Sequence, residues 1–239
     1  GQYSFLMLIY SNEASGEIVT FQFYDIETDE VFDIGETYEF ISDMTLGDVM
    51  NPEILNIFTG IDIDVPMASG WNWMSMNVFI DDMALNSVLG SLDNNATYIK
   101  NQLGYADYYS DFGWYGTLSD VNNVSMYKLN MLDEDNIVLT GTPVDVSATI
   151  FDLASGWNWI GYTPQISYDI NLALENVPEG NAIYIKSQTG YADYYLDFGW
   201  YGTLSGMDPF YGYVLNVLTE TTFIYYDGGA FNSGPGDIT

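Results

Sequence analysis

A near-perfect internal duplication limits what this chain can fold into. The segment ASGWNW at Ala68–Trp73 returns at Ala154–Trp159, an offset of 86 residues. At the same offset Tyr98–Ser119 aligns with Tyr184–Ser205 and differs at three of 22 positions. Identity over this length indicates a duplicated structural unit. We therefore expect two homologous folds that superpose.

Within each copy the pattern is mainly that of β-structure. Gly70–Phe79 (GWNWMSMNVF) alternates aromatic and polar residues, which is typical of a strand. A short amphipathic helix should follow, because apolar residues recur at the i, i+3, i+4, i+7 spacing. In the two copies these are Leu85, Val88, Leu89 and Leu92, and Ile170, Ala173, Leu174 and Val177. Residues 126–132 and 137–140 are predicted to form a hairpin around the DEDN turn at 133–136.

The first 67 residues are unlike the repeats. Glu17–Tyr24 alternates cleanly, and turn signals recur every 8–12 residues, as in a β-sandwich. Phe5–Tyr10 (FLMLIY) is continuously apolar and is predicted to be a strand buried on both faces. The predicted fold is thus mainly β. It begins with a β-sandwich-like module at 1–67, either complete or incomplete in this chain. Two tandem β-rich repeats follow at 68–153 and 154–227, each with a short helix, and then a tail or linker at 228–239.

The predicted first strand needs neighbours. An open apolar edge pairs readily with another chain, so we expect self-association, or contact with other segments of the same surface protein, through Phe5–Tyr10. The alternative is that residues 54–63 or the glycine-rich tail fold back and close this edge.

Charge excludes several classes of function. The chain has 34 acidic residues against three lysines, a formal net charge of −31, and no arginine, histidine or cysteine. Such a chain repels phosphate backbones, so nucleic-acid binding is not expected. A histidine- or cysteine-based nucleophile and an ordinary zinc site are also excluded, and we expect no enzyme. Salt and calcium relieve acidic self-repulsion, which favours an extracellular setting.

The duplicated aromatic motif has two interpretations. The favoured one is that its rings fill a small core. The alternative is that tyrosines stack on sugar rings, which would make the chain a carbohydrate-binding module. The tyrosines for that role are Tyr105, Tyr109 and Tyr115, repeated as Tyr191, Tyr195 and Tyr201. Exposed coplanar rings on one face would favour binding.

A structural motif is expected around the repeated lysines. Lysines retained at equivalent positions in so acidic a chain should be paired internally: Lys100 with Asp107 or Asp111, and Lys186 with Asp193 or Asp197. The tryptophans that complete this motif are Trp71, Trp73 and Trp114, with Trp157, Trp159 and Trp200 in the second copy.

One acidic turn is a candidate metal site. Asp133 and Asp135 could hold calcium, although no cluster matches an EF-hand loop. The alternative is a solvated turn.

Longer motifs carry a family resemblance. The motifs are GWNWIGY at 156–162, IKSQ at 185–188, and YSNEASGEIVTFQFYD at 10–25 with ETYEF at 36–40. Together they resemble repeat modules of large secreted or cell-surface proteins of marine Bacteroidetes, which are typically cargo of type IX secretion. The resemblance implies location and architecture and brings no catalytic residues. The expected function is a non-enzymatic structural or adhesive segment of a larger surface protein, appendage or filament.

Overall fold

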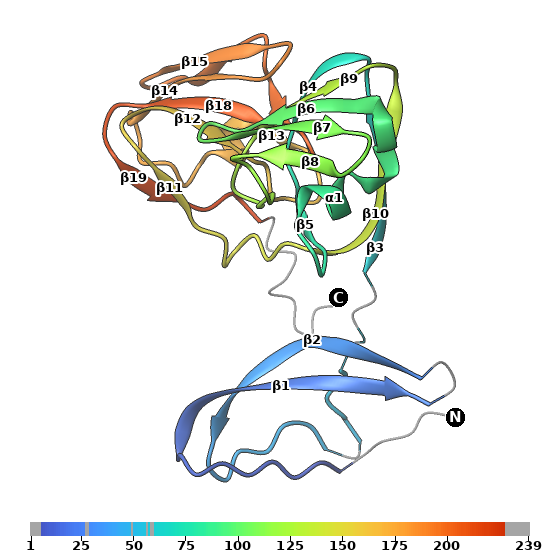
Figure 1. Cartoon of the computed structure of the whole chain (residues 1–239). Helices are drawn as coiled ribbons and strands as arrows, with labels where there is room; N and C mark the ends of the chain where they lie inside the picture. The colour runs from blue at the N-terminus through green and yellow to red at the C-terminus, as the bar shows by residue number, and fades with distance from the viewer. Residues whose placement is uncertain (1–5, 27–28, 49, 56, 58–59, 228–239) are drawn as a thin grey trace. The chain divides into compact units, whose positions relative to one another are not determined.

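The computed structural model describes residues 6–26, 29–48, 50–55, 57 and 60–227. These residues form mainly antiparallel β-structure, and all of the helices among them are short. The chain divides into two compact units, Gly1–Gly60 and Ile61–Thr239 (Figure 1). The expected tail at 228–239 lies outside the described residues.

The described part of the first unit is simpler than a sandwich. It contains a two-stranded sheet, in which β1 (Ser15–Asp25) pairs antiparallel with β2 (Glu30–Ile41). Leu6–Tyr10 forms no strand and is mostly exposed, with Leu6 at 92%, so the prediction of a buried strand there is wrong for these residues; Phe5 lies outside the described part. An apolar run becomes a strand only where neighbouring strands accept its hydrogen bonds, and none pairs with Leu6–Tyr10 among the described residues.

Each repeat builds the same five-stranded sheet. In repeat 1 the order is β4 (Gly70–Met74), β9 (Tyr127–Met131), β6 (Ala96–Lys100), β7 (Tyr105–Tyr109) and β8 (Gly113–Gly116). In repeat 2 it is β12 (Gly156–Ile160), β18 (Tyr213–Val217), β14 (Ala182–Lys186), β15 (Tyr191–Tyr195) and β16 (Gly199–Gly202). Even the register shift at the start of β6 recurs in β14. The expectation of two equivalent folds is confirmed.

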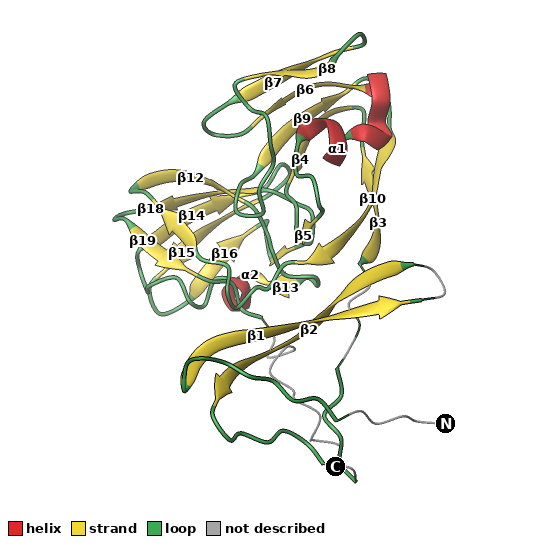
Figure 2. Ribbon diagram, turned by 60° about the horizontal axis from the view of Figure 1, so that its bottom comes forward, coloured by secondary structure: helices red, strands yellow, loops and turns green. Residues whose placement is uncertain are grey.

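The predicted helices are also present, as single turns on each sheet. They are α1 (Leu85–Val88) with the 3-10 helix η1 (Gly90–Asn95), and α2 (Ile170–Ala173), drawn in red in Figure 2. Leu85 and Val88 are buried in the core of repeat 1, as Ile170 and Ala173 are in the core of repeat 2. Each sheet therefore covers one apolar core.

The predicted hairpin after β9 is wrong. The strand that follows, β10 (Asp135–Pro143), turns away from β9 and pairs with β3 (Ile61–Met67) and β5 (Val78–Phe79). In repeat 2 the corresponding strand β19 (Thr221–Phe223) likewise leaves the sheet and pairs antiparallel with β11 (Phe151–Leu153). A further antiparallel pair in this repeat is formed by β13 (Tyr168–Asp169) and β17 (Gly206–Met207). β9 is already flanked by β4 and β6, so it has no free edge for β10. Because β3 packs into repeat 1, the first unit ends before β3 and not at residue 67.

The two repeats join through reciprocal backbone contacts. The end of β4 meets the segment before β18: Ser75 N–H donates to the Phe210 carbonyl at 2.8 Å, and Gly212 N–H to the Trp73 carbonyl at 3.2 Å. The end of β12 meets the segment before β9 in the same way, with Gly161 N–H donating to the Val124 carbonyl at 2.9 Å. The repeats are thus related by an approximate two-fold arrangement within one compact unit.

Where the two repeats meet, equivalent positions of the two copies lie so close together that only one of them can carry a side chain. Met126 corresponds to Gly212, and a Cβ on Gly212 would collide with the Met126 side chain. Ser75 corresponds to Gly161, where a Cβ would lie 2.5 Å from the Asn123 carbonyl oxygen and 3.2 Å from the Ser75 Cβ. Close packing leaves room for only one side chain of each pair. The repeats must therefore differ at these junction positions.

A glutamine from each repeat covers the exposed edge of the other repeat's sheet. Gln188 accepts from Trp73 N–H at 2.7 Å and donates to the Trp71 carbonyl at 2.6 Å. Gln102 does the same on β12, with 2.8 Å to Trp159 N–H and 2.9 Å to the Trp157 carbonyl. A primary amide carries one acceptor and donors beside it, as a peptide unit does. Each glutamine therefore replaces a neighbouring strand at an edge that would otherwise be open.

Removing these amides should loosen the pairing of the repeats. We expect Gln102→Ala and Gln188→Ala each to lower the free energy of unfolding by about 1 kcal/mol, because two hydrogen bonds on a partly solvated edge are lost. The two single variants should be similar and the double variant roughly additive, as measured by urea unfolding. Thr189→Ala, an exposed change on the same loop as Gln188, is the matched control and should stay within about 0.5 kcal/mol of the parent. A double variant as stable as the parent would contradict the role of the amides.

Candidate functional site

Strand alternation separates each five-stranded sheet into a core face and an outer face. In repeat 1, Ile99, Ala106 and Leu129 point to the core and are fully buried. Their neighbours Lys100 and Lys128 therefore lie on the outer face. The outer faces carry most of the polar and aromatic residues of the duplicated motif.

Aromatic rings run across each outer face. Trp71 meets Tyr98 edge-on with ring centres 5.9 Å apart, and Tyr98 stacks on Tyr105 at 6.0 Å. Repeat 2 has the same row, with 5.7 Å from Trp157 to Tyr184 and 5.9 Å from Tyr184 to Tyr191. These are favourable geometries for aromatic pairs, so the rows are ordered surfaces.

The interpretation of the tyrosines as core residues is wrong. All six tyrosines named for sugar stacking are exposed, and Tyr115 and Tyr201 are the most open at 69% and 78%. The physical reason is again alternation, since Tyr105 and Tyr109 lie on either side of the buried Ala106 and the half-buried Tyr108. The core side is filled by Trp114 and Trp200, which contact Tyr108 and Tyr194 edge-on.

The lysines contact tryptophans, and the predicted carboxylate pairs do not form. Lys100 Nζ lies 5.8 Å from the centre of the Trp71 ring, and Lys186 Nζ lies 5.5 Å from that of Trp157 and 5.9 Å from that of Trp73. The described part of the chain contains no salt bridge between a lysine and a carboxylate. Strand register explains the difference.

In that register the aspartates sit beside other residues. Lys100 stands opposite Tyr105, while Asp107 stands opposite Tyr98. Repeat 2 has the same pairs, with Lys186 opposite Tyr191 and Asp193 opposite Tyr184. Asp111 and Asp197 are exposed residues in the turns beyond β7 and β15. The aspartates therefore stay on the outer faces without reaching the lysines.

Lys128 occupies the junction itself. Its Nζ lies 4.1 Å from the ring centre of Trp73 and 4.4 Å from that of Trp159, one tryptophan from each repeat. Its equivalent in repeat 2 is Val214, so the junction holds one such cation. Burial, followed by repulsion from Lys100 and Lys186, holds the pKa of Lys128 below its usual value.

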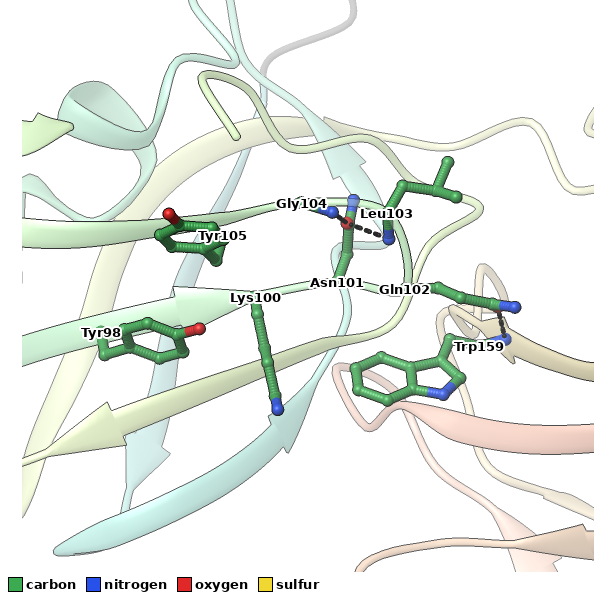
Figure 3. A pocket seen from close by; sticks show the side chains of 8 residues that line it. All are labelled: Tyr98, Lys100, Asn101, Gln102, Leu103, Gly104, Tyr105 and Trp159. Carbon is green, nitrogen blue, oxygen red and sulfur yellow. Dashed lines mark hydrogen bonds between the residues drawn. The ribbon is translucent and has the colours of Figure 1, made fainter. Parts of the chain in front are cut away.

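We call these seven residues the lysine–tryptophan cluster: Lys100, Lys128, Lys186, Trp71, Trp73, Trp157 and Trp159. Two adjoining hollows open on it. One, of about 410 Å³, is lined by Trp71, Trp73, Lys100, Lys128 and Gln188. The other, of about 370 Å³, is lined by Lys100, Trp159, Tyr98, Tyr105 and the loop 101–104. Figure 3 shows the Lys100 side chain extending between Tyr98 and Trp159.

The loops that present the glutamines are held by local hydrogen bonds. Asn101 Oδ1 accepts from the N–H groups of Leu103 and Gly104, at 2.9 and 2.7 Å (Figure 3). In repeat 2 the Ser187 hydroxyl accepts from Thr189 and Gly190 in the same way. The substitution of asparagine by serine between the copies therefore keeps the acceptor that shapes the loop.

The candidate calcium turn is held by side-chain amides. Asp135 accepts from Asn95 Nδ2 at 3.1 Å and from Asn136 N–H at 2.8 Å, which lowers the pKa of its carboxyl. The Asp133 N–H donates to Asn95 Oδ1 at 2.8 Å. Among the described residues no three acidic side chains are grouped so that they could hold a metal ion. Calcium binding at Asp133 and Asp135 stays a prediction.

Two parts of the site were not foreseen from the sequence: the edge-capping glutamines and Lys128. Gln102 and Gln188 are identical at the 86-residue offset, which was a usable signal. Lys128 has no counterpart in repeat 2, so the duplication gave no signal for it.

Comparison with protein-family models, curated proteins and solved structures found no match. No helix in the described part of the chain has the length and apolar character needed to cross a membrane. The interpretation of the site therefore depends on its geometry.

The lowered pKa of Lys128 is directly measurable, because the chain has only three lysines. We expect its ¹³Cε resonance to titrate with a midpoint below 10.5, the ordinary pKa of a lysine side chain. In Lys100→Met the midpoint should rise, since a like charge that opposes protonation is removed. Lys100→Arg keeps the charge and should leave the midpoint near that of the parent. A Lys128 midpoint at or above 10.5 in the parent would contradict the arrangement.

Proposed function

We propose that this chain is a non-enzymatic, extracellular adhesive segment of a larger surface protein, and that it binds carbohydrate on its aromatic outer faces. The observation that carries the proposal is the exposure of the duplicated tyrosines. Tyr115 and Tyr201 present large rings to solvent at the same position of the two outer faces, which offers a sugar ring two equivalent stacking surfaces.

The chemistry of the outer faces suits sugars. A pyranose ring offers an apolar face of C–H groups and a rim of hydroxyls, and an aromatic ring beside hydrogen-bonding groups complements both. Tyr98 and Tyr105 supply stacked rings, and Asp107 lies half-buried on the same face. Two such faces in one chain would raise the avidity for a polymer that reaches both.

A second candidate is a structural role through assembly. The observation that favours it is the exposure of apolar side chains in the first unit: Leu6, Ile18, Ile26 and Val31 are all more than half exposed. A two-stranded sheet with this surface gains stability by packing against another sheet. Filament or appendage formation through the first unit would use this surface.

Saccharide binding is the test that separates the candidates. The intact chain is applied to immobilised neutral and acidic polysaccharides, and the dissociation constant for a retained one is measured by calorimetry. We expect the double variant Tyr115→Ala, Tyr201→Ala to bind about tenfold more weakly, because the stacked contact is lost. Phe79→Ala, which removes an exposed ring outside the two outer faces, should bind as the parent does.

Two results would contradict carbohydrate binding on the aromatic faces. If no saccharide is retained, or if the tyrosine variant binds as tightly as the parent, the aromatic faces are not the binding surface. The structural role would then be the better account.

A further inference from the structure

Every positive side chain of this protein is gathered at one place. The three lysines account for all the side-chain cations, against 34 acidic residues. All three belong to the lysine–tryptophan cluster. The junction of the two repeats is therefore the one region of the chain whose formal side-chain charge attracts an anion.

The ammonium groups at this place retain unused hydrogen-bonding capacity. Each carries three N–H donors, and within the described chain none forms a salt bridge with a carboxylate. A tryptophan face stabilises the charge of an ammonium but does not take all of its N–H groups. Lys100 and Lys128 both line the hollow of about 410 Å³, so their free donors face a space that a ligand can enter.

Mutual repulsion makes an anion favourable here. Burial lowers the pKa of Lys128 most, and repulsion from Lys100 and then from Lys186 lowers it further. An acidic group placed among them would replace repulsion with charge-assisted hydrogen bonds, which are about twice as strong as neutral ones. The cluster is built of cations that have ring contacts and lack a counter-ion from the described chain.

We propose that the lysine–tryptophan cluster binds a saccharide that carries an anionic group, either a sulfate ester or a carboxylate. This inference rests on the proposed carbohydrate binding and adds the chemical class of the sugar. The anionic group lies among Lys100, Lys128 and Lys186, and the sugar ring stacks on Trp71 or Trp157. Neighbouring rings of the chain continue onto the tyrosine rows of either repeat.

A nucleic acid carries the same kind of charge but fits less well. Tracking a phosphate backbone requires a basic groove several residues long, whereas this chain offers three ammonium groups within a net charge of −31. A single sulfate or carboxylate at the cluster matches that number better. The chain also lacks arginine, which provides bidentate contacts to phosphate.

Calorimetry with defined oligosaccharides tests the proposal. The probes are a hexamer of galacturonic acid, a sulfated carrageenan hexasaccharide and neutral cellohexaose, with oligothymidylate as the nucleic-acid control. We expect at least one acidic hexamer to bind about tenfold or more tightly than cellohexaose, since a charge-assisted hydrogen bond contributes this much. Which acidic hexamer binds identifies the anionic group.

Lysine variants assign the binding to the cluster. Lys100→Met with Lys186→Met keeps the alkyl stems and removes two charges, and the preference for the acidic hexamer should fall about tenfold or more. Lys100→Arg with Lys186→Arg keeps the charges and should retain the preference. A thermal melt of each variant verifies that it is folded. On binding, the ¹³Cε resonance of Lys128 should titrate at higher pH, a change that a purely structural role would not produce.

Each outcome has a definite meaning. If acidic and neutral hexamers bind equally and the methionine variant is unaffected, this inference fails while carbohydrate binding on the tyrosine faces stands. If no saccharide binds, both fail. If oligothymidylate binds as tightly as the acidic hexamers, the cluster is a general anion site and the assignment to saccharides is overturned.

Discussion

The structure depends on how each five-stranded sheet closes one of its two edges, the edge formed by β4 in repeat 1 and by β12 in repeat 2. β4 and β12 are edge strands, and an open edge invites pairing with other chains. Here the closure comes from the other repeat: Gln188 bonds to β4, Gln102 bonds to β12, and the backbone segments before β18 and β9 extend the contact. Because each repeat completes its partner, the duplication produces one compact unit, and the outer faces of both sheets are brought to a common junction.

A two-fold junction also explains why the copies differ where they meet. Met126 faces Gly212, and Ser75 faces Gly161, because one space cannot hold both equivalent side chains. The equivalent residues Lys128 and Val214 also differ, and here the reason is charge. Two ammonium groups between the same tryptophans would repel strongly, whereas one is held by rings from both sides. The lysine–tryptophan cluster is thus a consequence of the junction, and its excess positive charge is what makes it a candidate for an acidic ligand.

The duplication made the repeats predictable, because equal sequences at a fixed offset require equal folds. Helix spacing located α1 and α2 for the same kind of reason, since the pattern is local. The hairpin after β9 and the strand at Leu6–Tyr10 were mispredicted because strand pairing is decided by which edges remain free, a property of the whole sheet. The partners of the lysines were mispredicted because the sequence does not reveal the pairing register of β6 and β7. That register places Tyr105, and not Asp107, opposite Lys100. The exposed tyrosines depended on which face of each sheet covers the core, and the aromatic composition is compatible with either face.

Amide hydrogen exchange at the two tryptophan edge strands tests the central claim most directly. Trp73 and Trp159 donate their N–H groups to glutamines of the opposite repeat. If the repeats form one cooperative unit, both amides should exchange slowly, at matching rates, and only through an opening that also exposes the core amides of β9 and β18. Fast exchange at both tryptophans, or exchange of one repeat well before the other, would contradict the account of the repeats as mutually completing halves.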